Sequence, residues 1–179
     1  YYLSKNAKLV EDISFSWEDQ FFIFFEDGLT FDGCGNKIII NINNYRGAFN
    51  NGVYNSYNNV YHNGVKIMDH TLMFNYKSGF SYITIKNVGV VVPVEQNYNI
   101  ASYCGWVCQP GFGIGGRELL IENCYTNGYV NNYGGGICGS YTAVLGSELH
   151  IKNCYNLRES YDGGIISVSY THLTLPTIA

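Results

Sequence analysis

A short phrase recurs along this chain and limits what the chain can fold into. Ile-x-Asn-Cys-Tyr stands at residues 121–125 and again at 151–155, and a looser copy, Ile-Lys-Asn-Val, stands at 85–88. Successive asparagines of the phrase are 36 (123 − 87) and 30 (153 − 123) positions apart. A repeat of about 20–50 residues built from short strand-like pieces is typical of a solenoid.

Within each copy, apolar and mostly polar residues alternate around the asparagine. Apolar residues lie four and two positions before it and one position after it. This period of two predicts a half-buried β-strand in each copy. The residues expected to face inward are Ile83, Leu119 and Leu149, then Ile85, Ile121 and Ile151, and finally Val88, Cys124 and Cys154.

The repeat is too short for a strand, a crossover helix and a returning strand with their loops. We therefore predict an all-β chain that forms a single-stranded parallel β-helix of about five coils, with equivalent residues stacked roughly 4.8 Å apart. The predicted inner ladders are Ile85, Ile121 and Ile151, and Val88, Cys124 and Cys154.

Two further ladders follow from the same alignment. Lys86, Glu122 and Lys152 are expected to form an outer ladder of alternating charge, which we interpret as setting the register of the strands. Asn87, Asn123 and Asn153 are expected at the bends, because asparagine tolerates tight turns and stacked amides bond to one another.

A glycine-rich apolar block follows each copy, at residues 104–107, 135–139 and 163–166. Glycine permits positive φ and close backbone approach, so these blocks are predicted at corners. Ile137 and Ile165 are expected to point inward as the next strand begins.

The segment from Ile121 to Gly139 resembles the GLUG-type repeats of bacterial surface proteins, in which N-C/S-Y-x-x-G-x-V alternates with G-G-L/I-V-G. Residues 29–38 are similar to the F-D-G-x-G-x-x-I opening coil of the same proteins. The resemblance extends over roughly residues 20–166 and implies a right-handed β-helix at the cell surface or outside the cell. Leu157 and Arg158 depart from it, because the family has a glycine near that bend.

Composition and net charge argue against some classes of partner. A chain of 179 residues suits one domain, and its net charge of −4 argues against a nucleic-acid partner. No apolar run reaches the length of a membrane-spanning helix, so no transmembrane segment is expected. No motif predicts a cofactor.

Residues 168–177 resemble the translation of a sequencing adaptor and contain neither glycine nor asparagine. We therefore interpret residues 1–167 as the β-helix repeat domain and 168–179 as a non-native tail, with a genuine C-terminal strand as the alternative. Because Tyr1 is not an initiator methionine, we expect a fragment of a longer protein that has further coils.

The six cysteines allow two interpretations. Stacked, buried free thiols are favoured because Cys124 and Cys154 share one column. A disulfide among Cys104, Cys108 and Cys138 is the alternative. A zinc site is disfavoured, since Cys104-x-x-x-Cys108 has no matching second pair.

Other patterns carry weaker hypotheses. Gly111–Gly116 imitates a dinucleotide-binding loop, but it leads into a strand and not into a helix. The acid pairs at 11–12, 18–19 and 26–27 point to opposite faces of a strand, and convergence of Asp27 with Asp32 is less expected than turn chemistry. Asp69-His70 has no nucleophile that can be placed beside it.

The stretch 50–64 is the least repetitive and is predicted to be a projecting loop. Exposed tyrosine and asparagine can stack on sugars or on a protein partner. Its weak candidate ligand-binding residues are Tyr54, Tyr57, Tyr61 and His62, and a polar loop without a ligand is the alternative.

These patterns favour a non-catalytic structural or adhesive module of a bacterial surface or secreted protein, with carbohydrate or a host or surface protein as its partner. The alternative is a carbohydrate-active β-helix enzyme, a polysaccharide lyase or glycosidase, whose active site lies partly in missing coils. No catalytic residue is assigned in this chain, because no pair of carboxylates or nucleophile with its base can be placed from sequence.

Overall fold

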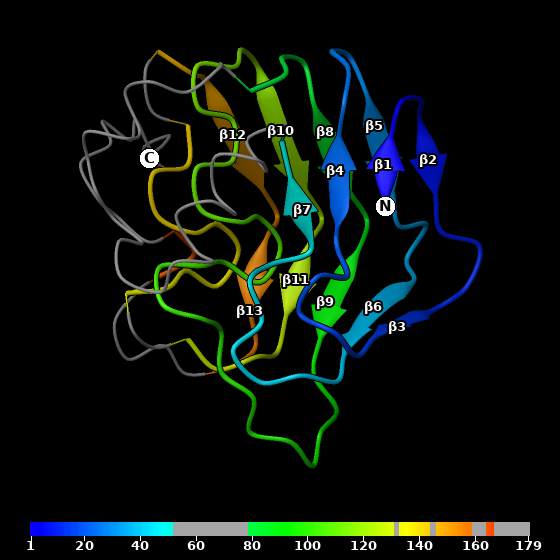
Figure 1. Ribbon diagram of the computed structural model, residues 1–179, viewed down its shortest axis with the longest axis vertical. Helices are drawn as coiled ribbons and strands as arrows, with labels where there is room; N and C mark the ends of the chain where they lie inside the picture. The colour runs from blue at the N-terminus through cyan, green and yellow to red at the C-terminus, as the bar shows by residue number, and fades with distance from the viewer. Residues whose placement is uncertain (52–78, 131–132, 144–145, 159–163, 167–179) are drawn as a thin grey trace.

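The computed structural model describes residues 1–51, 79–130, 133–143, 146–158 and 164–166, and this part of the chain contains strands and no helix (Figure 1). The prediction of an all-β chain is confirmed there, and no helix in it has the length and apolar character needed to cross a membrane. The strands are β1 (Tyr2–Leu3), β2 (Ala7–Lys8), β3 (Ile13–Phe15), β4 (Phe22–Phe24), β5 (Thr30–Asp32), β6 (Lys37–Ile40), β7 (Phe49–Asn50), β8 (Thr84–Lys86), β9 (Gly89–Val91), β10 (Leu119–Glu122), β11 (Tyr125–Thr126), β12 (Leu149–Lys152) and β13 (Tyr155–Asn156).

The strands form three parallel sheets. Sheet A has the order β1-β4-β7, sheet B the order β12-β10-β8-β5-β2, and sheet C the order β13-β11-β9-β6-β3. The chain visits them in one cyclic order, since β1, β2 and β3 belong to A, B and C and β4, β5 and β6 repeat that order. We call one such passage a circuit. Sheets B and C cross Figure 1 one above the other, with sheet A in front.

Later circuits continue the column of sheet A through isolated bridges. Phe49 bridges Cys108, Cys108 bridges Cys138, and Cys138 bridges Ile166, all in parallel. The glycine-rich blocks of the repeat therefore lie in one column, and Ile137 is fully buried as expected.

The register of sheet B follows the sequence repeat. Ile121 lies opposite Ile85 on one side and Ile151 on the other. The column continues to Phe31, opposite Ile85, and to Ala7, opposite Phe31. Adjacent positions alternate in burial, because successive side chains of a strand point to opposite faces.

The core changes character along the stack. Around the first circuits it is aromatic: the ring centroid of Phe22 lies 4.8 Å from that of Phe31 and 5.5 Å from that of Phe49. Farther along, aliphatic side chains and thiols such as Ile121 and Cys124 are fully buried together with Trp106.

The glycine of the N-C-Y-x-x-G phrase has a packing role. A Cβ at Gly128 would lie 2.1 Å from the indole of Trp106, so only glycine fits beneath that ring. The last circuit carries Arg158 at the equivalent position, two residues beyond the pairing of Thr126 with Asn156. The guanidinium of Arg158 lies 4.5 Å from the ring centroid of Tyr129 and donates to the carbonyl of Val94 at 3.3 Å.

Candidate functional site

The most regular polar feature of the molecule is the bend between sheets B and C. The chain leaves β8, β10 and β12 through Asn87, Asn123 and Asn153, whose φ values are 55°, 52° and 50°. This left-handed conformation is costly for most residues and is tolerated by asparagine. The prediction that these asparagines occupy bends agrees with this geometry.

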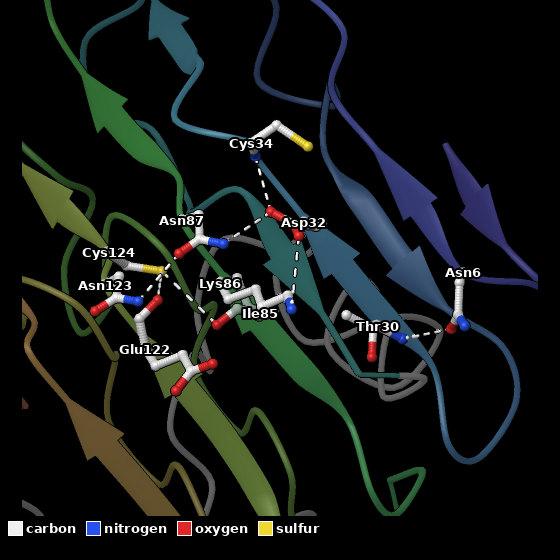
Figure 2. Close-up of polar contacts among 10 residues, drawn as sticks. All are labelled: Asn6, Thr30, Asp32, Cys34, Ile85, Lys86, Asn87, Glu122, Asn123 and Cys124. Carbon is white, nitrogen blue, oxygen red and sulfur yellow. Dashed lines mark hydrogen bonds and ion pairs between the residues drawn. The ribbon is translucent and has the colours of Figure 1, made fainter.

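The three amides and the carboxylate of Asp32 form a continuous hydrogen-bonded column, which we call the amide ladder. Figure 2 shows its members Asp32, Asn87 and Asn123. Asn153 Nδ2 donates to Asn123 Oδ1 at 3.2 Å, and Asn123 Nδ2 donates to Asn87 Oδ1 at 3.0 Å. Asn87 Nδ2 donates to Asp32 Oδ1 at 3.0 Å. Every bond runs in one direction, so the ladder ends on a carboxylate, which can only accept.

Asp32 joins the amide ladder to the turn that precedes β6. Its Oδ1 also accepts from the backbone N–H of Cys34 at 2.8 Å, and its Oδ2 lies 3.6 Å from the ammonium of Lys86. The hydrogen bonds from Asn87 and from the Cys34 N–H, with the charge of Lys86, lower the pKa of this carboxyl below its ordinary value.

A charged column runs beside the amide ladder. In the register of sheet B, Lys8 lies opposite Asp32, Asp32 opposite Lys86, Lys86 opposite Glu122, and Glu122 opposite Lys152. The sign of the side-chain charge therefore alternates from β2 to β12. Sequence reasoning found the last three members and missed Lys8 and Asp32. Lys8 and Asp32 precede bends of four residues, whereas the later bends between sheets B and C contain two residues. The repeated Ile-x-Asn phrase is therefore not recognisable around them.

The inner thiol column lies behind the bend. Cys124 and Cys154 direct Sγ toward the carbonyls of Ile85 and Ile121, at 3.8 and 3.6 Å. A hydrogen bond with Cys154, together with burial, raises the pKa of the Cys124 thiol, whereas the same bond lowers the pKa of Cys154.

A second pair of thiols, Cys108 and Cys138, lies in the column of isolated bridges that continues sheet A. Burial and the neighbouring Cys138 thiol raise the pKa of Cys108. All six cysteines are free thiols in the structure, and no disulfide joins Cys104, Cys108 and Cys138. The favoured interpretation of buried thiols holds for four of them, whereas Cys34 is exposed and Cys154 is half-buried. Within the described ranges, no group of three or more His, Cys, Asp or Glu residues could hold a metal ion.

Three of the acidic residues considered for catalysis bind segments far away in the sequence. Asp27 Oδ1 accepts from the Ser81 N–H at 2.7 Å, Asp12 Oδ1 accepts from the Lys37 N–H at 2.8 Å, and Glu18 pairs with Arg46 at 3.3 Å. Asp27 and Asp32 make separate contacts: that of Asp32 with Cys34 lies within a turn, whereas that of Asp27 joins it to a residue 54 positions along the chain.

The glycine segment Gly111–Gly116 forms consecutive tight turns that lead into β10. Its two apolar residues, Phe112 and Ile114, are buried, so the segment packs against the body. A dinucleotide loop opens a helix, and this segment does not.

The first two residues of the stretch predicted to be a projecting loop, Asn50 and Asn51, are buried. Asn50 closes β7 and is buried, with its Nδ2 donating to Gln109 Oε1 at 3.0 Å, and the buried Asn51 bonds both backbone groups of Phe80. Sequence reasoning missed this polar cluster, since nothing in the repeat pairs residue 50 with residue 109. Tyr54, Tyr57, Tyr61 and His62 lie outside the described residues, as do Asp69-His70 and residues 168–179.

The hydrogen bonds of the amide ladder link successive strands of sheet B, and Lys86 and Asp32 form an ion pair beside it. Comparison with protein-family models, curated proteins and solved structures gave no match.

Proposed function

We propose that this chain is part of a right-handed parallel β-helix that serves as a structural or adhesive module of a bacterial cell-surface or secreted protein, without catalysis of its own. The β-helix is supported by the cyclic order in which the chain visits sheets A, B and C. The right hand is the rule for parallel crossover connections within a sheet.

The observation that carries the functional proposal is the self-contained use of polar groups. The amide ladder joins four residues from four successive strands of sheet B, and its terminal carboxylate is fully engaged with Asn87, the Cys34 N–H and Lys86. A catalytic carboxylate must instead be free to meet substrate within hydrogen-bond reach. Stacking that satisfies itself suits a rigid stalk, whose stability is a sum over neighbouring circuits.

The carbohydrate-active alternative can be separated from the adhesive module by one experiment. Labelled protein is applied to an array of acidic and neutral polysaccharides, and the same mixtures are analysed for released oligosaccharides. An adhesive module binds without product, and a purely structural stalk does neither. Release of oligosaccharides by the purified chain would overturn the non-catalytic proposal.

Location is tested separately. Antibodies raised against the chain are expected to label intact cells of the source bacterium, or its culture fluid, before permeabilisation. Labelling that appears only after permeabilisation would contradict a surface or secreted module.

A further inference from the structure

Four of the six cysteines are stacked in two pairs, each of which joins successive circuits in register. Cys108 lies opposite Cys138 in a parallel bridge. Cys124 lies level with Cys154, because the strands on either side of this bend set each residue opposite the one 30 positions later. Two thiols on neighbouring circuits are therefore brought together twice in the molecule.

The spacing of the circuits suits a disulfide between stacked cysteines. Neighbouring strands lie about 4.8 Å apart, and the Cα atoms of a disulfide are separated by roughly 4.4–6.8 Å. Sγ of Cys154 lies 3.6 Å from the carbonyl oxygen of Ile121, so it already reaches toward the circuit that holds Cys124. Sγ of Cys124 contacts the carbonyl of Ile85 (Figure 2) and must turn toward Cys154, which is a rotation about a single bond.

The two pairs differ in how far solvent reaches them. Cys154 is half-buried, whereas Cys108, Cys124 and Cys138 are buried. A hydrogen bond with Cys124 also lowers the pKa of the Cys154 thiol, and the thiolate is the form that attacks a disulfide. A dissolved oxidant thus meets an attacking sulfur at Cys154, and it meets none at the pair of Cys108 and Cys138.

We propose that Cys124 and Cys154 are a site of oxidative modification, at which a low-molecular-weight disulfide converts the two stacked thiols into a disulfide. This cross-link fastens the circuit of β12 and β13 to the circuit of β10 and β11. The inference depends on the register of sheets B and C, so it stands or falls independently of where the protein works.

The reaction consists of two thiol–disulfide exchanges. The Cys154 thiolate attacks one sulfur of the small disulfide, breaks its S–S bond and releases one small thiol, which leaves a mixed disulfide on Cys154. The Cys124 sulfur then attacks the Cys154 sulfur, which breaks the mixed disulfide and releases the second small thiol. The two protein thiols lose two electrons to the small disulfide, and their two protons pass through solvent to the two released thiols.

The test exposes the whole folded chain to oxidised glutathione and stops the reaction at a series of times with iodoacetamide in urea, which alkylates every remaining thiol. Digestion without reductant and mass spectrometry identify the linked peptides. A peptide that links Cys124 to Cys154 is expected to accumulate at least about tenfold faster than one that links Cys108 to Cys138, because the buried pair becomes accessible only on unfolding. The link closes a loop of 30 residues (154 − 124), so the melting temperature of the oxidised chain should rise by about 5 °C.

Variants separate the roles of the two thiols. Cys124→Val introduces the residue that the preceding circuit has at this level, Val88, and should leave Cys154 arrested as its mixed disulfide with glutathione. Cys154→Ser should leave Cys124 unmodified. Cys34→Ser, at the exposed cysteine, is the matched control and should leave the rate of linkage unchanged. Circular dichroism checks that each variant remains folded.

Three results would overturn the proposal. The first is a folded chain in which Cys154 remains a thiol, or keeps glutathione, while no link to Cys124 forms. The second is linkage of Cys108 to Cys138 at the same or a higher rate. The third is a cross-linked chain whose melting temperature is unchanged, because the disulfide would then not fasten the two circuits.

Discussion

At the scale of the residue, asparagine at the bend has two separable roles. Its backbone adopts a left-handed conformation, and its amide links one circuit to the next. Asn123 does both, with a φ of 52° and bonds to Asn87 and Asn153. A substitution series can divide the two contributions.

Asn123→Ala is expected to lower the free energy of unfolding by about 2 kcal/mol, since it removes the amide and puts a Cβ-bearing residue without local hydrogen bonding at positive φ. Asn123→Gly removes the amide but tolerates the conformation, so it should cost only about 1 kcal/mol. Urea unfolding of both variants measures the difference. Equal losses would mean that the backbone conformation contributes nothing at this site.

Asp32 predicts a pH dependence whose sign follows from its lowered pKa. A carboxyl whose pKa is lower folded than unfolded stabilises the fold above the unfolded value of about 3.9 and loses that contribution as pH falls through the folded value. The difference in melting temperature between the parent chain and Asp32→Asn should therefore be greatest near neutral pH and should disappear below about pH 4.

The control for this pH profile is Asp19→Asn, at an exposed residue of a turn. It should shift the melting temperature little at any pH. A gap for Asp32→Asn that stays constant down to about pH 2 would show that the carboxylate charge is not what stabilises the bend.

At the scale of the element, the inner strands β10, β8 and β5 of sheet B are stabilised by the strands on both sides. Ile121 has Ile85 and Ile151 as column neighbours and is fully buried, while Ile151 lies at the edge and is half-buried. The same side chain in the same register thus occurs in two environments, which makes a matched pair.

Ile121→Ala is expected to lower the free energy of unfolding by about 3 kcal/mol, because the loss of apolar contacts adds to the cost of a cavity. Ile151→Ala should cost less than half as much, since solvent already reaches that side chain. Urea titration with comparison of midpoints and slopes checks both. Equal losses would show that the edge of β12 is as well covered as the middle of the sheet.

Much of sheet B could be predicted from the sequence because the phrase that builds it is nearly identical in its copies. The isoleucine column and the bend asparagines followed from spacing alone. Phe31, Asp32 and Lys8 join the same columns through four-residue bends, which hide the phrase. At Gly33, the counterpart of Asn87, a Cβ would lie 2.4 Å from the Asn87 carbonyl, so glycine replaces asparagine there.

The buried polar cluster illustrates what sequence patterns cannot supply. Asn50 and Gln109 are 59 residues apart and belong to no shared motif, so only the folded chain brings their amides together. Burial of Asn50 follows from its place at the end of β7. Sequence patterns predict a loop for polar residues outside a repeat, whereas hydrogen bonds between distant segments bury them in the folded chain.

At the scale of the whole molecule, stability is expected to vary along the stack. Each circuit contacts its neighbours, so the last circuit is supported from one side within the described residues. Local opening should therefore begin there and cost less than global unfolding. The cysteines report on this gradient, because Cys154 is half-buried at the edge whereas Cys104, Cys108, Cys124 and Cys138 are buried.

Thiol alkylation should consequently proceed in three stages. Cys34 is exposed and reacts first, and Cys154 follows through opening of the last circuit, helped by the lowered pKa of its thiol, since the thiolate is the reactive form. The four buried thiols should react only at the rate of global unfolding. Pulsed alkylation with peptide mapping by mass spectrometry measures each site, with a urea-unfolded sample in which all six react as the control. If Cys108 or Cys138 were labelled together with Cys154 under native conditions, the stack would be opening throughout and not from its end.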